Sequence, residues 1–431
     1  MTADTSAAKT GLPAEVARRR PVLWENPRLG PAAEVLAALP LGIADVRDAE
    51  ARWERFALLL SRLFPEVAST NGHIDSELME TAALAPDGVR LLVKADHALP
   101  VTGCIKARGG VYEVLFVAER IAIEAGLLRH GEDASALAGD AARAHFGEHR
   151  IVVGSTGNLG FSVGTMARAL GFRTEVHMSR DAKAWKKDRL RRIGAEVVEH
   201  AGDFTAAVAG ARTAAAADPQ SYFVDDEDSV PLFLGYSVAA FDIQKQLAAR
   251  GVAVDADHPL FVYLPCGVGG SPGGITFGLK LLFGDAVRCI FVEPVGAPCF
   301  LVQLAAGAGE PRPISELGLQ VDTIADGLAV GAASLLVVRT VERLVDACVT
   351  CEDPDLYRWL ARAWKQAGLR LEPSAAAGFL GLEALLADTG RLGDIARAPS
   401  ATHVIWTTGG AHLPDTEFDE SLARADAKPD R

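Results

Sequence analysis

Lys106 stands in a stretch whose composition could make its side-chain amine a nucleophile. Residues 99–110 (LPVTGCIKARGG) surround it with small and apolar side chains, ahead of an apolar helical pattern. Most lysines are solvated cations, so a surface lysine is the plain alternative. A lysine that is partly removed from water is more readily a neutral amine, which can bond covalently to a carbonyl compound. Lys106 is therefore a candidate for covalent catalysis.

Three glycine-rich segments each follow a predicted strand and could bind an anion. They are residues 154–160 (GSTGNLG), residues 266–274 (CGVGGSPGG) and residues 407–410 (TTGG). Glycine lets backbone N–H groups approach an anion, and a following helix adds its positive N-terminal dipole. A tight turn without a ligand explains any one segment, but three in one chain favour a phosphate site.

These segments lack the fingerprints of nucleotide-binding loops. The chain has no GxxxxGK[ST] run, and neither strand-to-helix turn spells GxGxxG with an acidic residue about twenty positions later. This disfavours an NTPase and a nicotinamide-dependent oxidoreductase. A phosphate-binding loop combined with a nucleophilic lysine instead suggests pyridoxal phosphate.

The elements that must position these residues alternate between strands and helices. Helical spacing covers residues 159–171, 183–193 and 231–250, and Gly171 and Gly194 stand where helices should end. This alternation predicts an α/β fold with an open, mostly parallel sheet covered on both faces. Short aliphatic runs predict the strands at residues 89–93, 151–153, 174–178, 196–199, 222–224, 260–264, 288–292 and 404–406.

The composition is that of a chain with a full hydrophobic core. Its 431 residues are 49% hydrophobic and 23% charged. Length alone favours roughly two or three domains, of which we expect two. The net charge of -13 argues against a nucleic-acid partner. No apolar run is long enough to cross a membrane, and six scattered cysteines fit reduced thiols, so a cytoplasmic protein is expected.

Seven segments along the chain form a more specific pattern. They are residues 102–110 (TGCIKARGG), 154–161 (GSTGNLGF), 182–187 (AKAWKK), 233–237 (FLGYS), 264–270 (LPCGVGG), 325–331 (ADGLAVG) and 371–375 (LEPSA). Together they resemble the D-serine dehydratase family of fold-type II pyridoxal phosphate enzymes. The resemblance runs from about Trp24 to about Leu422 and implies a tryptophan synthase beta-like fold. It also implies a large cofactor-binding domain (residues 1–106 and 226–431) and an inserted smaller α/β domain (residues 107–225) that carries the asparagine loop.

The resemblance assigns cofactor-binding roles to individual residues. Lys106 matches the lysine that bonds covalently to the cofactor, and Asn158 matches the asparagine that contacts the ring hydroxyl. Thr408 matches the hydroxyl residue that faces the pyridine nitrogen. The phosphate loop is implied at Gly267, Val268, Gly269 and Gly270.

The implied activity is the deamination of D-serine to pyruvate and ammonia, and of D-threonine to 2-oxobutanoate. Lys106 is one candidate base for the α-proton. Because a D-amino acid turns its α-hydrogen to the other face of the cofactor, Thr156 supported by Asp226 is the second predicted catalytic group. Ser155, Thr156 and Asn158 are expected to bind the substrate.

Relatives of this kind use a cation near the cofactor, and Glu293, after a strand, is the candidate ligand for Na⁺ or K⁺. The sequence departs from the family pattern at Cys104, where serine is usual, and at Ser271, where glycine is common. His412 replaces part of a glycine- and methionine-rich run, and a solvated histidine is expected there.

Other readings of the sequence stay open. An L-serine or L-threonine dehydratase or a serine racemase would share the fold and the cofactor. A catalytically silent regulatory protein that binds a phosphorylated ligand is a different class, but it would have no use for Lys106 together with Asn158 and Thr408. We expect a monomer that binds small amino acids and no nucleic acid or membrane.

Overall fold

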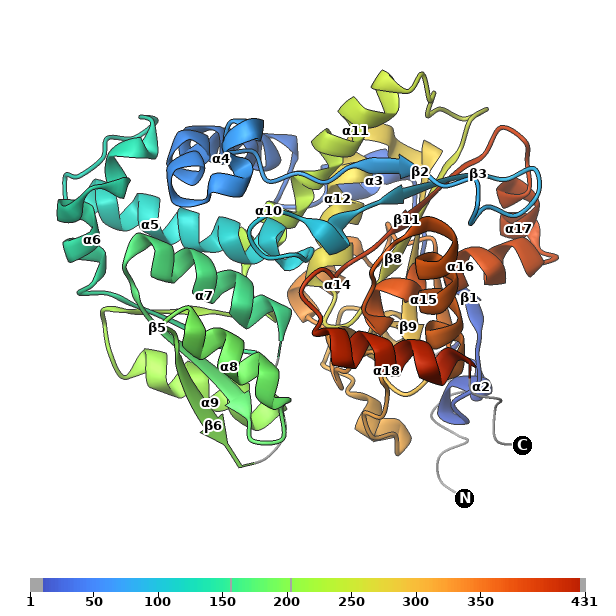
Figure 1. The fold of residues 1–431 in the computed structure, drawn as a ribbon. Coiled ribbons are helices and arrows are strands. Elements are labelled where there is room, and N and C mark those ends of the chain that lie inside the picture. The colour runs from blue at the N-terminus through green and yellow to red at the C-terminus, as the bar shows by residue number, and fades with distance from the viewer. Residues whose placement is uncertain (1–10, 156, 202–203, 427–431) are drawn as a thin grey trace. The chain divides into compact units, whose positions relative to one another are not determined.

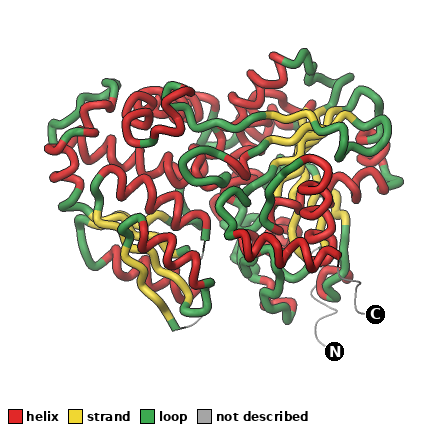
Figure 2. Tube along the Cα trace, viewed as in Figure 1, coloured by secondary structure: helices red, strands yellow, loops and turns green. Residues whose placement is uncertain are grey.

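The computed structural model describes residues 11–426 except residue 156 and residues 202–203, and it packs as two compact units (Figure 1). The first unit comprises residues 1–43, 76–98 and 236–431, and the second comprises residues 44–75 and 99–235. Each unit has its own sheet, drawn in yellow in Figure 2. The predicted α/β class with mostly parallel sheets is confirmed.

The first unit is built on a sheet with the strand order β1-β10-β9-β8-β11-β3-β2. The five inner strands run parallel, whereas the edge strands β1 and β2 pair antiparallel with their neighbours. In chain order the strands are β1 (Leu23–Glu25), β2 (Leu78–Glu80), β3 (Arg90–Lys94), β8 (Leu260–Pro265), β9 (Val287–Pro294), β10 (Ala347–Cys351) and β11 (Thr402–Trp406).

Helices cover both faces of this sheet. On one face, α16 (Pro373–Ala387) can approach closely because a Cβ at Gly381 would lie 2.6 Å from the side chain of Val292. On the other face, α12 (Gly270–Phe283) carries Thr276 beside Cys289. The other helices of this unit are α2 (Ala14–Ala17), α3 (Ala32–Ala37), α11 (Ala239–Ala249), α13 (Cys299–Ala306), α14 (Leu335–Val341), α15 (Asp353–Ala367), α17 (Arg391–Ala396) and α18 (Asp415–Asp426).

The second unit has a fully parallel sheet with the order β6-β5-β4-β7. Its strands are β4 (Arg150–Gly154), β5 (Arg173–Ser179), β6 (Glu196–His200) and β7 (Ser221–Val224). Its helices are α4 (Ile43–Leu63), which begins at the unit boundary, α5 (Tyr112–Glu124), α6 (Asp140–Phe146), α7 (Asn158–Leu170), α8 (Ala184–Arg192) and α9 (Phe204–Ala216). Helix α10 (Val230–Ser237) crosses the boundary between the units.

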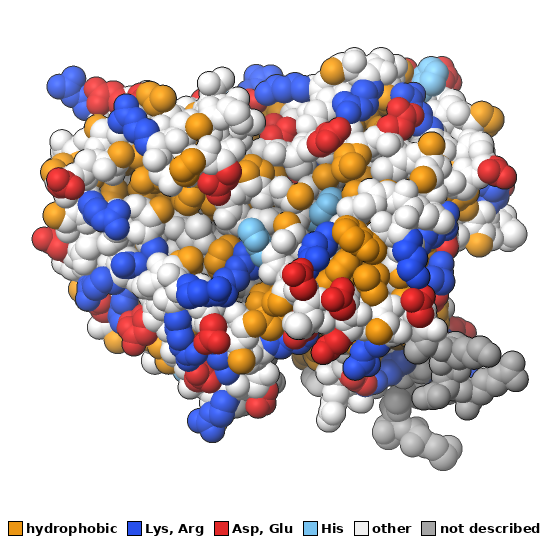
Figure 3. Space-filling model, viewed as in Figure 1, with side chains coloured by type: hydrophobic (Ala, Val, Ile, Leu, Met, Phe, Trp, Pro, Cys, Tyr) orange, Lys and Arg blue, Asp and Glu red, His pale blue; other side chains and the backbone are white. Residues whose placement is uncertain are grey.

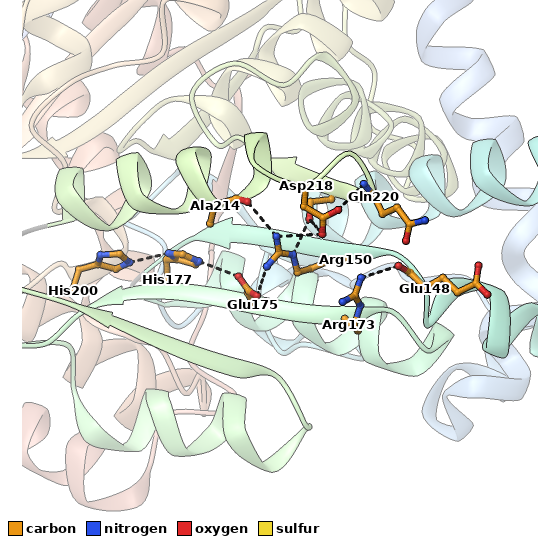
Figure 4. Close-up of polar contacts among 10 residues, drawn as sticks. Glu148, Arg150, Arg173, Glu175, His177, His200, Ala214, Asp218 and Gln220 are labelled. Carbon is orange, nitrogen blue, oxygen red and sulfur yellow. Dashed lines mark hydrogen bonds and ion pairs between the residues drawn. The ribbon is translucent and has the colours of Figure 1, made fainter.

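A polar network ties the strands of the second unit together (Figure 4). Arg150, at the start of β4, donates to Glu175 on β5 and to the backbone oxygen of Ala214 on α9. Glu175 also lies 3.4 Å from His177, whose Nδ1 is 2.8 Å from Nε2 of His200 on β6. These contacts fix β4 and β5, and β4 leads directly into the asparagine loop.

The eight predicted strands all form, and Gly171 and Gly194 adopt the left-handed conformation after α7 and α8. Residues 231–250 form two helices, α10 and α11, where the sequence pattern suggested one stretch. The predicted domain limits stay a prediction. Helix α4 lies in the same compact unit as α5, and Arg52 of α4 forms a buried ion pair with Glu119 of α5.

Charged side chains of both signs are interspersed on the molecular face drawn in Figure 3. Within the described residues, no helix is both long enough and apolar enough to cross a membrane.

Candidate active site

Lys106 and Asp226, both predicted as catalytic, lie side by side in the second unit. Lys106 directly precedes a π-helical turn (Ala107–Val111) that continues into α5. Its side chain is only 20% exposed, and Nζ lies 3.6 Å from Oδ2 of Asp226, whose side chain is 13% exposed. The other carboxylate oxygen of Asp226 is buried and has no partner among the described residues. The amine is thus partly removed from water and paired with a carboxylate.

The asparagine loop connects β4 to α7 in the same unit. The Oγ of Ser155 accepts hydrogen bonds from the backbone N–H groups of Gly157 and Gly160, at 3.2 and 3.0 Å. Ser155 therefore satisfies amides at the N-terminus of α7, where Asn158 is the first helical residue. Its predicted contact with substrate stays a prediction, as does that of Asn158. Thr156 lies outside the described residues.

Close packing holds this loop against the turn that carries Lys106. A Cβ at Gly110 would lie 3.1 Å from Leu159 of α7, so glycine permits the approach. The Sγ of Cys104 lies 3.6 Å from Oγ of Ser162, also on α7. The lysine turn and the asparagine helix therefore form one packed element, and the thiol of Cys104 occupies the serine position without disrupting it.

The predicted phosphate loop lies at the start of α12 in the first unit. Gly269 caps this helix with a φ of 109°, and a Cβ there would lie 2.3 Å from the ring of Phe300. A Cβ at Gly267 would lie 3.2 Å from the Cα of Leu328. Among the described residues no side chain caps the start of α12, so its first amides and its dipole are suited to an anion. Ser271 lies in this first turn and keeps its backbone N–H, so it does not weaken the loop.

Thr408 follows β11 and is 8% exposed. Its Oγ1 is buried and, within the described part of the chain, has no hydrogen-bond partner. A buried hydroxyl without a partner is unfavourable unless a ligand satisfies it. The backbone around it is fixed, because a Cβ at Gly410 would lie 2.2 Å from the backbone oxygen of Arg370. This hydroxyl suits a pyridine nitrogen, and the orphaned group fits the predicted cofactor.

The segment that carries Thr408 is supported by a histidine that sequence reasoning missed. Thr407 donates its hydroxyl proton to the backbone oxygen of Lys94, at 2.9 Å. Its oxygen must therefore accept from Nδ1 of His97, at 2.8 Å, which fixes the histidine tautomer. Burial lowers the pKa of His97 to about 4, so the ring is neutral near pH 7. An isolated histidine in the sequence gave no sign of this role.

Glu293, the candidate cation ligand, is fully buried at the end of β9. Its two carboxylate oxygens accept the backbone N–H groups of Phe300 and Leu301, at 2.7 and 2.8 Å, so it caps α13. Burial raises its pKa to about 8. No cluster of three metal-binding side chains occurs among the described residues. A cation role for Glu293 stays a prediction.

The remaining sequence features have structural explanations. Cys348 and Cys351 both lie on β10, where residues three apart point to opposite faces, so they cannot act as a pair. All six cysteines are free and buried. His412 is exposed, in agreement with the solvated histidine expected there.

Comparison with known proteins agrees with this geometry. The family described as "Pyridoxal-phosphate dependent enzyme" matches residues 70–398. A "Probable D-serine dehydratase" from Pseudomonas aeruginosa (strain UCBPP-PA14) is 50% identical over 425 residues, which cover 95% of each chain. Another from Chromobacterium violaceum is 50% identical over 427 residues, covering 96% of this chain and 95% of the relative.

Solved structures share the fold. Diaminopropionate ammonia lyase from Escherichia coli, in a complex with D-serine, superposes with a TM-score of 0.72 over 94% of this chain and 97% of the other, at 18% identity. The chain belongs to the pyridoxal-phosphate dependent enzymes and, within them, to the family of the D-serine dehydratases. The predicted family, fold type and cofactor are confirmed.

Proposed function

We propose that this enzyme converts D-serine to pyruvate and ammonium, and D-threonine to 2-oxobutanoate. The observation that carries the proposal is the Lys106–Asp226 pair packed beside the asparagine loop, in a chain that matches probable D-serine dehydratases along nearly its whole length. The reaction breaks the Cα–H and Cβ–O bonds of serine and releases water. Hydrolysis of the resulting enamine consumes one water, so the net change involves no oxidant or reductant.

Bound pyridoxal phosphate would withdraw electrons from the substrate Cα and so make its proton acidic. Lys106 would bond to the cofactor and later carry a proton at Nζ. Asp226 holds a negative charge near that nitrogen and orients it. Thr156 is the proposed second proton carrier, and Ser155 and Asn158 are the proposed substrate contacts.

Residues of the first unit are the proposed contacts to the phosphate and the ring of the cofactor. The amides of Gly267, Val268, Gly269 and Gly270 would hold the phosphate at the N-terminus of α12. Thr408 would meet the pyridine nitrogen with a neutral hydroxyl. Because such a partner does not hold that nitrogen protonated, it favours elimination over transamination.

Three further properties complete the proposal. The six buried free thiols support the cytoplasm as the working compartment, where thiols stay reduced. We also propose a monomer, and a monovalent cation, K⁺ or Na⁺, as a second cofactor.

The test is pyruvate release by the purified protein with added pyridoxal phosphate, comparing D-serine with L-serine. We expect D-selective release that Lys106→Ala abolishes. Lys365→Ala, at an exposed lysine on α15, is the matched control and should keep full turnover. Release from L-serine alone would move the enzyme to the L-amino-acid branch, and interconversion of the serine enantiomers would indicate a racemase. No turnover of either would favour the silent regulatory protein.

A further inference from the structure

Glu113 is a buried acid that the predicted site did not include. It lies in the first turn of α5, seven residues after Lys106 on the same continuous helical run, and its exposed fraction is 0%. Carboxylates are seldom fully buried without a cationic partner. The partners of Glu113 are instead two hydroxyl groups, and the positions of these groups indicate which segment Glu113 holds in place.

Both hydroxyl groups belong to the segment that carries Asp226. Tyr222 lies on β7, before Asp226, and its OH donates to Oε1 of Glu113 at 2.8 Å. Ser229 follows Asp226 and donates to the same oxygen, also at 2.8 Å. The Ser229 oxygen in turn accepts the backbone N–H of Leu232 in α10. Glu113 therefore holds both ends of residues 222–229.

The charges around Glu113 favour its neutral form. Burial raises the pKa of Glu113 to about 8, the two hydroxyl bonds oppose this, and the nearby carboxylates of Asp226 and Asp225 raise it further. Glu227 and Asp228 add two more acids to this segment. Lys106, Arg212 and Arg120 are the cations that contact it among the described residues. A neutral Glu113 can hold the segment without adding another negative charge beside Asp226.

We propose that Glu113 is a positioning residue that holds Asp226 against Lys106 by fixing both ends of residues 222–229 to the helical run that starts at the lysine. The proposal rests on the proposed function, because it assigns a role to the Lys106–Asp226 pair. In this role Glu113 contacts neither Lys106 nor the substrate. It acts only by placing the carboxylate of Asp226.

The experiment compares Glu113→Ala with Glu113→Gln in the enzyme reconstituted with pyridoxal phosphate. Alanine removes both hydrogen bonds, whereas the amide oxygen of glutamine can still accept both. We expect Glu113→Ala to lower kcat for D-serine about 100-fold with little change in KM, and Glu113→Gln to keep kcat within about threefold. In the absence of substrate, the pH midpoint of the visible absorption of the bound cofactor should shift in Glu113→Ala and stay at the wild-type value in Glu113→Gln.

Two further variants keep the test decisive. The double variant Tyr222→Phe/Ser229→Ala removes the same two bonds, together with the bond from the Leu232 N–H to Ser229, but leaves Glu113 in place. It should reproduce the loss if Glu113→Ala does not fold. Glu119→Ala is the matched control, because Glu119 is buried on the same helix but pairs with Arg52 and Arg55. It should lower the Tm and leave kcat and the absorption midpoint unchanged.

Unchanged kcat and midpoint in Glu113→Ala and in the double variant would overturn the proposal. A loss in Glu113→Gln as large as that in Glu113→Ala would also overturn it, because the proton of the acid would then matter rather than its hydrogen bonds. If the wild type made no pyruvate from D-serine, the proposed function would fail. The absorption measurement needs no substrate and would still decide the role of Glu113.

Discussion

The two units hold their predicted functional residues by different physical means. In the first unit the predicted phosphate loop is fixed by close approach, since a Cβ at Gly269 would collide with Phe300, whereas the Thr408 segment combines close approach at Gly410 with the hydrogen bonds of Thr407. In the second unit Lys106, Asp226 and Glu113 are held by hydrogen bonds and charges. Substitutions in the predicted phosphate loop should therefore act mainly through steric fit, and those around Lys106 through protonation and orientation.

The largest effect is expected for Gly269→Ala. The left-handed backbone costs a non-glycine residue about 1–2 kcal/mol, and overpacking against Phe300 adds about 1–3 kcal/mol. If most of this free-energy cost is borne by the loop that would bind the phosphate, affinity for pyridoxal phosphate drops roughly a thousandfold. Absorbance titration measures this affinity. Gly284→Ala, at the other end of α12, is the control, because its φ is 55° but a Cβ there meets no atom within 4 Å. Equal affinities in the two variants would contradict the steric account.

The fold was largely predictable because strands buried in a parallel sheet are short aliphatic runs. β10 was not among the predicted strands, because its five residues (ACVTC) contain one valine and no other long aliphatic side chain. The edge strands β1 and β2 have three residues each, which is too short for a periodic pattern. Residues 231–250 looked continuous because both α10 and α11 are apolar on their buried sides.

Candidate site residues could be predicted only where the residue type and its local sequence indicate a function. A lysine among small residues and glycines after strands can be recognised in a sequence. Glu113 could not, because its partners Tyr222 and Ser229 are more than a hundred residues away and only folding brings them together. Its one local signal is its place between Tyr112 and Val114 in an apolar helix, where a charged residue is unexpected.

A smaller loss, about 100-fold in kcat, is expected for Asp226→Asn in the second unit. The amide keeps the shape of the carboxylate but removes the charge beside Lys106, so cofactor binding should change little. Asp228→Asn, at an exposed position of the same segment, should behave as the wild type. Steady-state kinetics with D-serine and a cofactor titration measure both quantities, and a loss of cofactor affinity without a loss of kcat would contradict this assignment.

Thr408→Val should have opposite effects on the protein with and without cofactor. Without cofactor the hydroxyl has no partner among the described residues, so valine should leave the Tm unchanged or raise it. With cofactor bound, the proposed hydrogen bond from Thr408 to the ring would be lost, and turnover should fall about tenfold. Thr407→Val is the matched control: it breaks the bonds to Lys94 and His97 and should lower the Tm without cofactor. A lowered Tm in both variants would mean that Thr408 is structural.

The smallest effect on turnover, but a clear one on stability, is expected for Glu113→Gln. The pKa of Glu113 rises from 4.5 to about 8 on folding, so the unfolded chain loses this proton first. Its contribution to stability is therefore present below about pH 4.5 and is lost progressively as the pH rises to about 8. Thermal unfolding at pH 5 and pH 8 should show that the Tm of Glu113→Gln rises relative to the Tm of the wild type as the pH rises.

Glu293→Gln is the corresponding test of a buried acid in the first unit. Both carboxylate oxygens of Glu293 accept backbone N–H groups, so an amide nitrogen would face one of these donors. This variant should unfold at a lower temperature than the wild type at pH 5, and by a smaller margin at pH 8, because burial also raises the pKa of Glu293 to about 8. A Tm equal to that of the wild type at pH 5 would show that the two buried acids do not differ in this way.

The most direct test of the account is to identify the residue that bonds to the cofactor. The protein is reconstituted with pyridoxal phosphate, reduced with borohydride and digested, and its peptides are mapped by mass spectrometry. We expect a stable phosphopyridoxyl adduct on Lys106, in the second unit. An adduct on Lys94 or Lys280, the buried lysines of the first unit, or the absence of any adduct, would contradict it.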